Sequence, residues 1–358
     1  VPEPLRTSCL KDFLATRQAG ETAATATNYE EWLQAAFGPV FTQHFPEAYT
    51  RKYWTLPSRD LTTGWVGGRV FYPDVTAVEK GYEGAQEGST HYISSIRYPK
   101  KGGYHRYAAG MEEGMQVTCN KEVQSIDLQK KEICFNDGDI HRYQTLISTL
   151  PLSRFVQYCA APESIQQSAV ELSCSQLLLL NFEVAHPALR TEQWLYVYDE
   201  EMYSTRINFT ELLSPDNAPQ EKCGIQVEVY YSKYKPLNEP IDHIREKVQE
   251  ELVQMGLIRN SSDVENCHTQ WIPFANVIFD HPSEVSLNSI LEWLTSYGLV
   301  REEDDLATMT DWDEKIGSPV ALGSLILAGR FSQWKYYWTD DCVLRGKYIS
   351  DTINCKKQ

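Results

Sequence analysis

The sequence predicts an α/β fold in which short β-strands and amphipathic helices follow one another along 358 residues. Three observations lead to this prediction. A strand-sized apolar run at 324–328 ends at a glycine and is followed by a loop and a helix start. Short β-rich runs joined by a hairpin turn occupy residues 117–151. Longer strands between 177 and 231 are followed by amphipathic helices. A chain of this length is expected to form more than one domain.

The N-terminal third is predicted to be helical, with a long loop. Residues 5–17 and 29–37 show helical spacing of apolar positions, and Asn28 with Glu31 forms a capping-box pattern at the second helix. Residues 41–49 continue as a further helix. The Gly- and Tyr-rich residues 71–97 predict a long loop, and a short helix is expected after it at 104–112.

The middle of the chain carries the clearest strand signals. Runs at 117–119, 123–127 and 132–135 are short and β-rich. Asn136-Asp137-Gly138 is a hairpin turn, followed by a return strand at 140–143. Residues 146–151 then predict a buried strand that ends in a proline turn.

The remainder predicts a mainly antiparallel sheet and three helices. The strands are expected at 177–184, 194–198 and 224–231, with a further strand and loop at 271–281. Glycines close the two central helices, which span 241–255 and 287–297. The last helix starts at Asp340 and runs through residue 349.

Composition limits the classes of function. The formal charge of −16 and the pI near 5.0 argue against nucleic acid or an anionic membrane as the main partner. No apolar run approaches the ~20 residues that span a bilayer. Nine cysteines without a C-x-x-C pair favour reduced thiols in a cytoplasmic protein. Cys267-His268 has no partner ligands at zinc spacing, so no metal is expected.

Three segments resemble motifs of a known family. The C-terminal one is a Gly-Arg-aromatic run that leads to an aromatic-basic-Tyr triplet and an acidic helix start. Its matching residues are Gly329, Arg330, Phe331, Trp334, Lys335, Tyr336, Asp340 and Asp341. The second, at 49–57, reads Tyr-Thr-Arg-Lys-Tyr-Trp-Thr-Leu-Pro, and the third, at 203–215, starts with Tyr-Ser-Thr-Arg and ends with Ser-Pro. Together they resemble the FAD-dependent amine oxidase superfamily, in its UDP-galactopyranose mutase-like branch.

The resemblance implies FAD as cofactor and two sets of site residues. The residues expected to contact the cofactor are Gly329, Arg330, Tyr336, Asp340, Asp341 and Cys342. Those expected to bind substrate are Trp54, Arg69, Tyr203, Arg206 and Tyr336. The flavin ring would do the chemistry, so no side chain need act as nucleophile. Arg206 and Arg330 would assist by neutralising phosphate or reduced-flavin charge.

The resemblance also implies the domain organisation. An incomplete, discontinuous Rossmann-type FAD domain is expected from residues 115–152 and 316–358. Residues 1–114 would form the helical and loop part of a substrate domain, and residues 153–315 its antiparallel sheet and helices. The sequence departs from the true mutases near Pro273-Phe274, where those enzymes carry adjacent tyrosines. The resemblance therefore implies the branch and leaves the sugar ring contraction open.

One family feature is missing from the sequence. No G-x-G-x-x-G follows a strand, and this is the fingerprint that holds the FAD pyrophosphate. Three explanations remain: a fragment of a longer enzyme, a second chain that supplies the missing half, or loss of flavin. The first two are favoured because the segment at Gly329 keeps its full pattern.

These inferences predict a FAD-dependent oxidoreductase or mutase that acts on a nucleotide-linked sugar or a similar polar metabolite. The alternative is a non-catalytic binding subunit that keeps the fold and binds no flavin alone.

Overall fold

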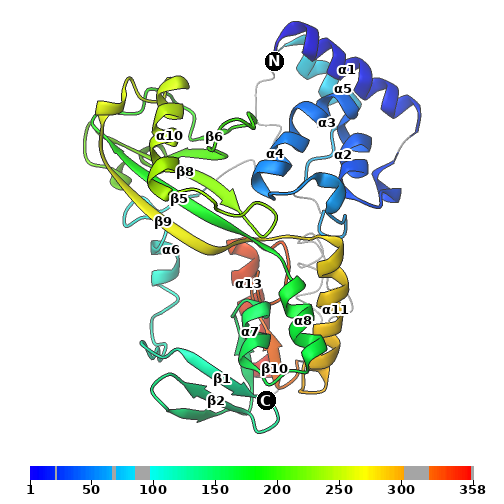
Figure 1. Ribbon diagram of the computed structural model, residues 1–358, viewed down its shortest axis with the longest axis vertical. Helices are drawn as coiled ribbons and strands as arrows, with labels where there is room; N and C mark the ends of the chain where they lie inside the picture. The colour runs from blue at the N-terminus through cyan, green and yellow to red at the C-terminus, as the bar shows by residue number, and fades with distance from the viewer. Residues whose placement is uncertain (21, 67–69, 85–96, 302–321, 356–358) are drawn as a thin grey trace. The chain divides into compact units, whose positions relative to one another are not determined.

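A computed structural model describes residues 1–20, 22–66, 70–84, 97–301 and 322–355 (Figure 1). It contains helices, antiparallel sheets and a parallel strand pair, so the predicted α/β class is confirmed. The chain divides into two compact units. Unit 1 comprises Val1–Asp60, Phe71–Gln116 and Ser175–Asn276, and unit 2 comprises Leu61–Val70, Val117–Cys174 and Val277–Gln358. The domain bounds predicted from the sequence differ from these units, since they place residues 153–174 and 277–315 in the substrate domain.

Unit 1 is built on a five-stranded sheet of order β6-β7-β8-β5-β9. Its strands are β5 (Cys174–Val184), β6 (Trp194–Tyr196), β7 (Arg206–Phe209), β8 (Cys223–Tyr231) and β9 (Val264–Val277). The pairs β6–β7, β7–β8 and β8–β5 are antiparallel. The predicted antiparallel sheet is therefore present.

One face of this sheet forms the core of unit 1. Because strand side chains alternate between faces, Ile225, Val227 and Val229 of β8 all point to one side and are fully buried. Helix α10 (Ile241–Gln254) covers them with its own buried row of Ile244, Val248 and Leu252. The opposite face carries the polar alternates of the same strands.

The remaining helices of unit 1 are mostly N-terminal. They are α1 (Glu3–Gln18), α2 (Tyr29–Phe37), α3 (Pro39–His44), α4 (Pro46–Tyr53), α5 (Val75–Glu83), α6 (Arg106–Ala109) and α9 (Thr210–Leu213). The helix predicted at 41–49 is in fact two, because the backbone turns at Phe45 before Pro46. The long loop predicted at 71–97 is wrong where α5 forms. The helix predicted at 104–112 shortens to α6.

In the described residues, unit 2 holds two small sheets and four helices. A meander joins β1 (Val123–Asp127), β2 (Glu132–Phe135) and β3 (Ile140–Arg142), and a parallel pair joins β4 (Leu146–Ser148) to β10 (Leu325–Leu327). The helices are α7 (Leu152–Tyr158), α8 (Glu163–Glu171), α11 (His281–Thr295) and α13 (Thr339–Cys355). The predicted meander is confirmed from residue 123 onward, but the run at 117–119 forms no strand.

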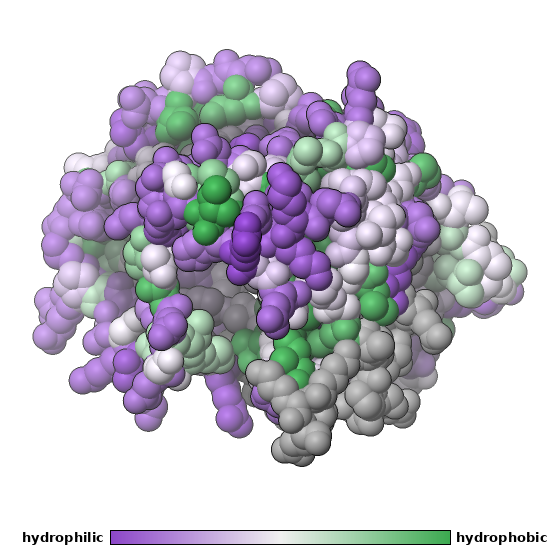
Figure 2. Space-filling view, turned by 90° about the horizontal axis from the view of Figure 1, so that it is seen from below, coloured by the Kyte–Doolittle hydropathy of each residue, from purple (hydrophilic) through white to green (hydrophobic). Residues whose placement is uncertain are grey.

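The surface is largely hydrophilic on the face that Figure 2 shows. Figure 2 shows hydrophilic residues over most of one face, with hydrophobic ones in separate groups. Among the described residues, no helix combines the length and the apolar character needed to cross a bilayer.

Candidate functional site

The segment predicted to contact the cofactor lies in unit 2, between β10 and α13. Gly329 takes a φ of +90°, a conformation that favours glycine, and a Cβ built there would meet no heavy atom within 4 Å. The Gly329 N–H donates to Gln333 Oε1 at 3.1 Å, and the Gln333 N–H donates back to the Gly329 carbonyl at 3.0 Å. The loop is thus closed on itself and leaves open space beside its glycine.

Trp334 is the strained residue of this loop. Its φ of +56° is rare for a bulky side chain, and it is only 2% exposed. Its indole Nε1 is buried and has no hydrogen-bond partner within the described part of the chain. Backbone strain and an orphaned buried donor are costly, and such features concentrate at functional sites.

Arg330 and Tyr336 form a cation–π pair against two further aromatic rings. The Arg330 Cζ lies 5.1 Å from the Tyr336 ring centroid. Trp65 stacks on Phe279 at 5.6 Å, and Tyr336 meets the Trp65 ring edge-on at 5.5 Å. The Arg330 Nε is buried and unpartnered among the described residues. Sequence reasoning missed Trp65 and Phe279.

The first turn of α13 holds the other predicted cofactor residues, and they differ in role. Asp341 is buried, and its Oδ2 accepts the Trp338 N–H at 2.5 Å, so this carboxylate caps its own helix. Asp340 is exposed. Burial raises the pKa of the Cys342 thiol, opposed by a hydrogen bond with the Arg330 backbone. The thiol is therefore protonated at neutral pH.

A pocket adjoins this segment within unit 2. Its lining includes β10, Leu299 and four polar side chains, those of Arg301, Gln333, Lys335 and Arg345. Two of these side chains, Gln333 and Lys335, belong to the predicted cofactor loop and carry hydrogen-bond donors.

Arg206 lies on the polar face of the unit 1 sheet. The register places it between Tyr196 of β6 and Glu228 of β8. Its Nη2 donates to Glu228 Oε1 at 2.6 Å, while Glu228 Oε2 accepts the Tyr230 hydroxyl at 2.5 Å. Burial opposes the charge of the guanidinium, but Glu228 and the neighbouring tyrosines hold the pKa of Arg206 above its usual range.

Arg206 keeps unused donors. Its side chain is 32% exposed, and Nη2 makes its one hydrogen bond within the described residues. The Nε is buried and lacks an acceptor among those same residues. A guanidinium presents five N–H groups in a fixed fork, so most of this fork has no partner in the part of the chain that the structure describes.

Helix α4 adds an aromatic wall beside this face. Tyr49 contacts Tyr196 edge-on with 5.4 Å between ring centroids, and Tyr53 lies 4.8 Å from Tyr230. Burial raises the pKa of the Tyr49 hydroxyl well above its usual value. Trp54 is buried and packs edge-on against Tyr53 at 5.1 Å.

Tyr203 makes hydrogen bonds to two carboxylates. Its hydroxyl donates to Glu239, with both carboxylate oxygens within 3.0 Å, and its N–H donates to Glu251 Oε1 at 2.6 Å. Arg69 lies outside the described residues. Trp54, Tyr203 and Arg206 belong to unit 1, and residues 329–342 belong to unit 2.

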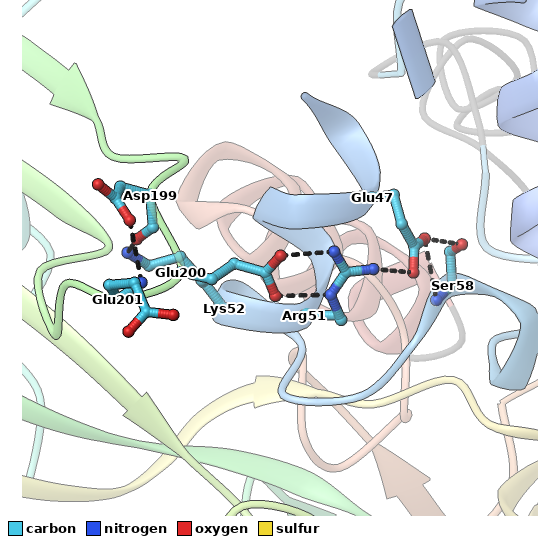
Figure 3. Close-up of polar contacts among 7 residues, drawn as sticks. All are labelled: Glu47, Arg51, Lys52, Ser58, Asp199, Glu200 and Glu201. Carbon is cyan, nitrogen blue, oxygen red and sulfur yellow. Dashed lines mark hydrogen bonds and ion pairs between the residues drawn. The ribbon is translucent and has the colours of Figure 1, made fainter. Parts of the chain in front are cut away.

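Polar contacts fasten α4 to the loop between β6 and β7 (Figure 3). Arg51 makes two parallel bonds to the Glu200 carboxylate, at 2.7 and 2.6 Å, and a third to Glu47 Oε1 at 2.7 Å. The Lys52 Nζ donates to the carbonyls of Asp199 and Met202. These contacts join the helix that carries the aromatic wall to the loop that leads into β7.

Sequence reasoning missed several members of the unit 1 site, which are Tyr49, Tyr53, Tyr196, Glu228 and Tyr230. Strand alternation placed Glu228 on the polar face, but only the strand register sets it beside Arg206. Among the described residues, no group of three His, Cys, Asp or Glu side chains is placed to hold a metal ion.

The chain shares its fold with a mutase and two oxidases of known structure. No family model matches the chain. A reduced UDP-galactopyranose mutase is similar at a TM-score of 0.79 and 20% identity, over 94% of this chain and 68% of the mutase. A putative protoporphyrinogen oxidase from Exiguobacterium sp. 255-15 gives a TM-score of 0.66 at 10% identity, over 99% of this chain and 73% of that one. A putrescine oxidase gives 0.55 at 9% identity, over 99% and 76%. At these identities the likeness shows a shared fold.

Proposed function

We propose that this chain is the substrate-binding and flavin-contacting part of a FAD-dependent oxidoreductase or mutase of the UDP-galactopyranose mutase-like branch. It acts in the cytoplasm on a nucleotide-linked sugar or a similar polar metabolite. The described cysteines are all free thiols, which supports a reducing compartment. The shared fold and the three motif segments support the branch.

The observation that carries the proposal is the state of Arg206. A buried Nε without an acceptor costs free energy, roughly 1–3 kcal/mol for an unsatisfied group, unless a ligand supplies the acceptor. A diphosphate presents pairs of oxygens that can accept two parallel bonds from the guanidinium fork. Tyr196, which is exposed on the strand next to Arg206, offers an aromatic surface beside that fork.

The loop at 329–336 fits a planar, acceptor-rich cofactor. The open space at Gly329 and the orphaned donors of Arg330 and Trp334 are what the edge of an isoalloxazine ring would require. When bound, the flavin would supply the electron transfer or the covalent chemistry. In this chain Arg330 would hold negative charge, and Tyr336 would position that arginine by its ring contact.

The proposal includes a second polypeptide segment that completes the FAD site. Within the described residues, the parallel sheet of unit 2 has two strands, β10 lines the pocket, and the outer edge of β10 carries one parallel bridge, from Leu325 to Leu299. A parallel strand added at that edge would supply the missing dinucleotide-binding turn.

A charge-conserving substitution at Arg206 tests the substrate assignment. Arg206→Lys keeps a cation beside Glu228 but loses the fork. We expect the affinity for UDP, measured by isothermal titration calorimetry, to fall by about 1.5–3 kcal/mol while the melting temperature changes little. Unchanged affinity with a lowered melting temperature would show that Arg206 belongs to the scaffold.

Glu228→Gln is the matched control. It removes the ion pair of Arg206 without touching the guanidinium. Stability should fall, because the Tyr230 hydroxyl and Arg206 lose a charged acceptor, while UDP binding should persist. Loss of binding equal to that of Arg206→Lys would mean that the ion pair itself, not the free fork, is required.

A binding subunit without flavin is the second candidate. The observations that favour it are the absence of the G-x-G-x-x-G fingerprint and the two-stranded parallel sheet of the described residues. The visible spectrum decides between the two. Flavin bands in the protein purified from its native cells, together with any chain bound to it, would support the enzyme.

A further inference from the structure

The loop between β6 and β7 is held by two buried side chains of opposite charge. This loop, residues 199–204, leads directly into β7 and Arg206. On one side Lys52 of α4, only 3% exposed, donates through Nζ to the carbonyls of Asp199 and Met202, the latter at 2.9 Å. The lysine thus binds backbone rather than a carboxylate.

Glu251 of α10 holds the other end of the loop and is 7% exposed. Its Oε1 accepts the Tyr203 N–H at 2.6 Å. Its Oε2 accepts the Ser204 N–H at 3.0 Å and the Ser204 hydroxyl at 2.5 Å. Three donors therefore meet one carboxylate. Hydrogen bonds to a charged group are about twice as strong as neutral ones.

We infer that Lys52 and Glu251 are positioning residues, which fix the start of β7 and thereby hold the Arg206 guanidinium at the aromatic wall of α4. The inference rests on the proposed ligand role of Arg206. Lys52 sits on the same helix as Tyr49 and Tyr53, so one side chain ties the wall to the strand that carries Arg206. A surface contact would not need a buried ammonium, whose desolvation is costly.

Arg51 provides an internal comparison. It binds the same loop through the Glu200 carboxylate, but its side chain is 36% exposed and that of Glu200 is 45% exposed. Exposed pairs contribute little, typically below about 1 kcal/mol. Arg51→Met therefore removes a loop contact without removing the buried carbonyl contacts.

The charged groups that face Lys52 set its titration. They are Arg51 of α4, Asp199 and Glu200 of the 199–204 loop, Lys235 of the segment that follows β8, and Glu251 of α10. Burial lowers the pKa of Lys52 to about 8, with Lys235 acting in the same direction and the carboxylates opposing. Near pH 8 the charged bonds to the two carbonyls are thus replaced by weaker neutral ones.

This titration gives opposite signs for stability and for binding. Because the pKa of Lys52 is lower in the folded chain than in the unfolded one, its contribution to stability increases as the pH rises from about 8 toward 10.5. UDP affinity should instead decrease over the same range, since the Lys52 side chain that binds the loop loses its charge. A purely structural lysine would not weaken binding while stability rises.

The experiment compares Lys52→Met, Glu251→Gln and Arg51→Met with the wild-type chain. UDP affinity is measured by calorimetry from pH 7 to 9, and amide hydrogen exchange of residues 203–207 is measured without ligand. We expect Lys52→Met and Glu251→Gln to weaken UDP binding about tenfold or more and to speed this exchange. Arg51→Met should stay within about twofold of wild type. The decrease in affinity above pH 8 should persist in Arg51→Met and vanish in Lys52→Met, which controls for titration of UDP itself.

Two results would overturn the inference. One is wild-type affinity and unchanged exchange in Lys52→Met, and the other is equal damage from Arg51→Met. If the wild type binds no UDP, or Arg206→Lys binds it normally, the proposed function fails instead. In that case the ligand-free hydrogen exchange still tests whether Lys52 and Glu251 hold the 199–204 loop. Faster exchange in both Lys52→Met and Glu251→Gln supports this role, and unchanged exchange refutes it.

Discussion

At the scale of single residues, buried arginine donors point to the site more clearly than the motif match does. Arg206 and Arg330 come from separate units, yet both have a buried Nε without an acceptor among the described residues. Native proteins satisfy nearly all such groups. The Nε of Arg345 is also buried without an acceptor among these residues, although its Nη2 donates to the Leu327 carbonyl at 3.4 Å. The orphaned donors thus include the two arginines that the sequence had assigned to phosphate and flavin.

Gly38 gives a residue-scale prediction with an internal control. Its φ is +79°, and an added Cβ would lie 2.8 Å from Asp12 Oδ2 and 3.0 Å from the Phe13 backbone nitrogen. Gly20 has a similar φ of +74° but open space around it. We expect Gly20→Ala to cost about 1 kcal/mol from the left-handed conformation alone. Gly38→Ala should cost clearly more, about 2–4 kcal/mol, because the clash adds to that strain.

Urea unfolding of both variants checks this difference. Asp12 Oδ2 also accepts the Val40 N–H at 2.8 Å, so a displaced carboxylate would weaken the start of α3 as well. Equal losses in the two variants would show that the neighbours of Gly38 move aside at no cost.

At the scale of elements, the start of α2 tests how the sequence pattern is realised. The Asn28 Oδ1 accepts the Glu31 N–H at 3.0 Å, as the capping-box pattern predicts. The Glu31 carboxylate, however, accepts the N–H of Thr27 at 2.8 Å, one residue before the cap. This bond lowers the pKa of Glu31 below its usual value. The stabilisation that this bond gives to the start of α2 is therefore present at pH values above the ordinary pKa of glutamate. It is lost as the pH falls through the lowered pKa of Glu31.

Asn28→Ala should destabilise unit 1 by about 1 kcal/mol, because α2 loses its N-cap acceptor. Thermal unfolding at pH 7 measures the loss. Glu30→Ala is the control, since Glu30 lies in the same first turn and makes no capping bond. A Glu30→Ala loss as large as that of Asn28→Ala would show that any change in this first turn destabilises α2, so the loss could not be assigned to the cap.

Elements with strong local signals could be predicted from the sequence, and those set by tertiary packing could not. The meander has an Asn-Asp-Gly turn, and α10 has a periodic apolar face, so both were predicted. Helices α5, α7 and α8 were missed because they are short and, except for Asp74 before α5, lack side-chain caps. The site divides in the same way. Arg206 and Gly329 are carried by motifs, whereas Trp65 and Phe279 meet only through the fold.

At the scale of the whole molecule, the two units differ in how complete their sheets are. The sheet of unit 1 has five strands with a covered apolar face, and the parallel sheet of unit 2 has two strands in the described residues. Ile147 of β4 is 45% exposed. Sheets of two strands are marginal without further packing, whereas three or more with a hydrophobic face are stable. The stability of the chain is therefore expected to be uneven.

Hydrogen exchange followed by mass spectrometry tests this unevenness and the cofactor together. Amides of β10 should exchange faster than those at the centre of β8, although both strands are buried, because β8 is paired on both sides. Added FAD should slow exchange at 325–342 if this chain contributes to a flavin site, and UDP should slow exchange at 203–207. Protection by UDP with none by FAD would favour the flavin-free binding subunit. Equal protection of β10 and β8 without any ligand would contradict the expected difference, since it would mean that the parallel pair is already as stable as the complete sheet.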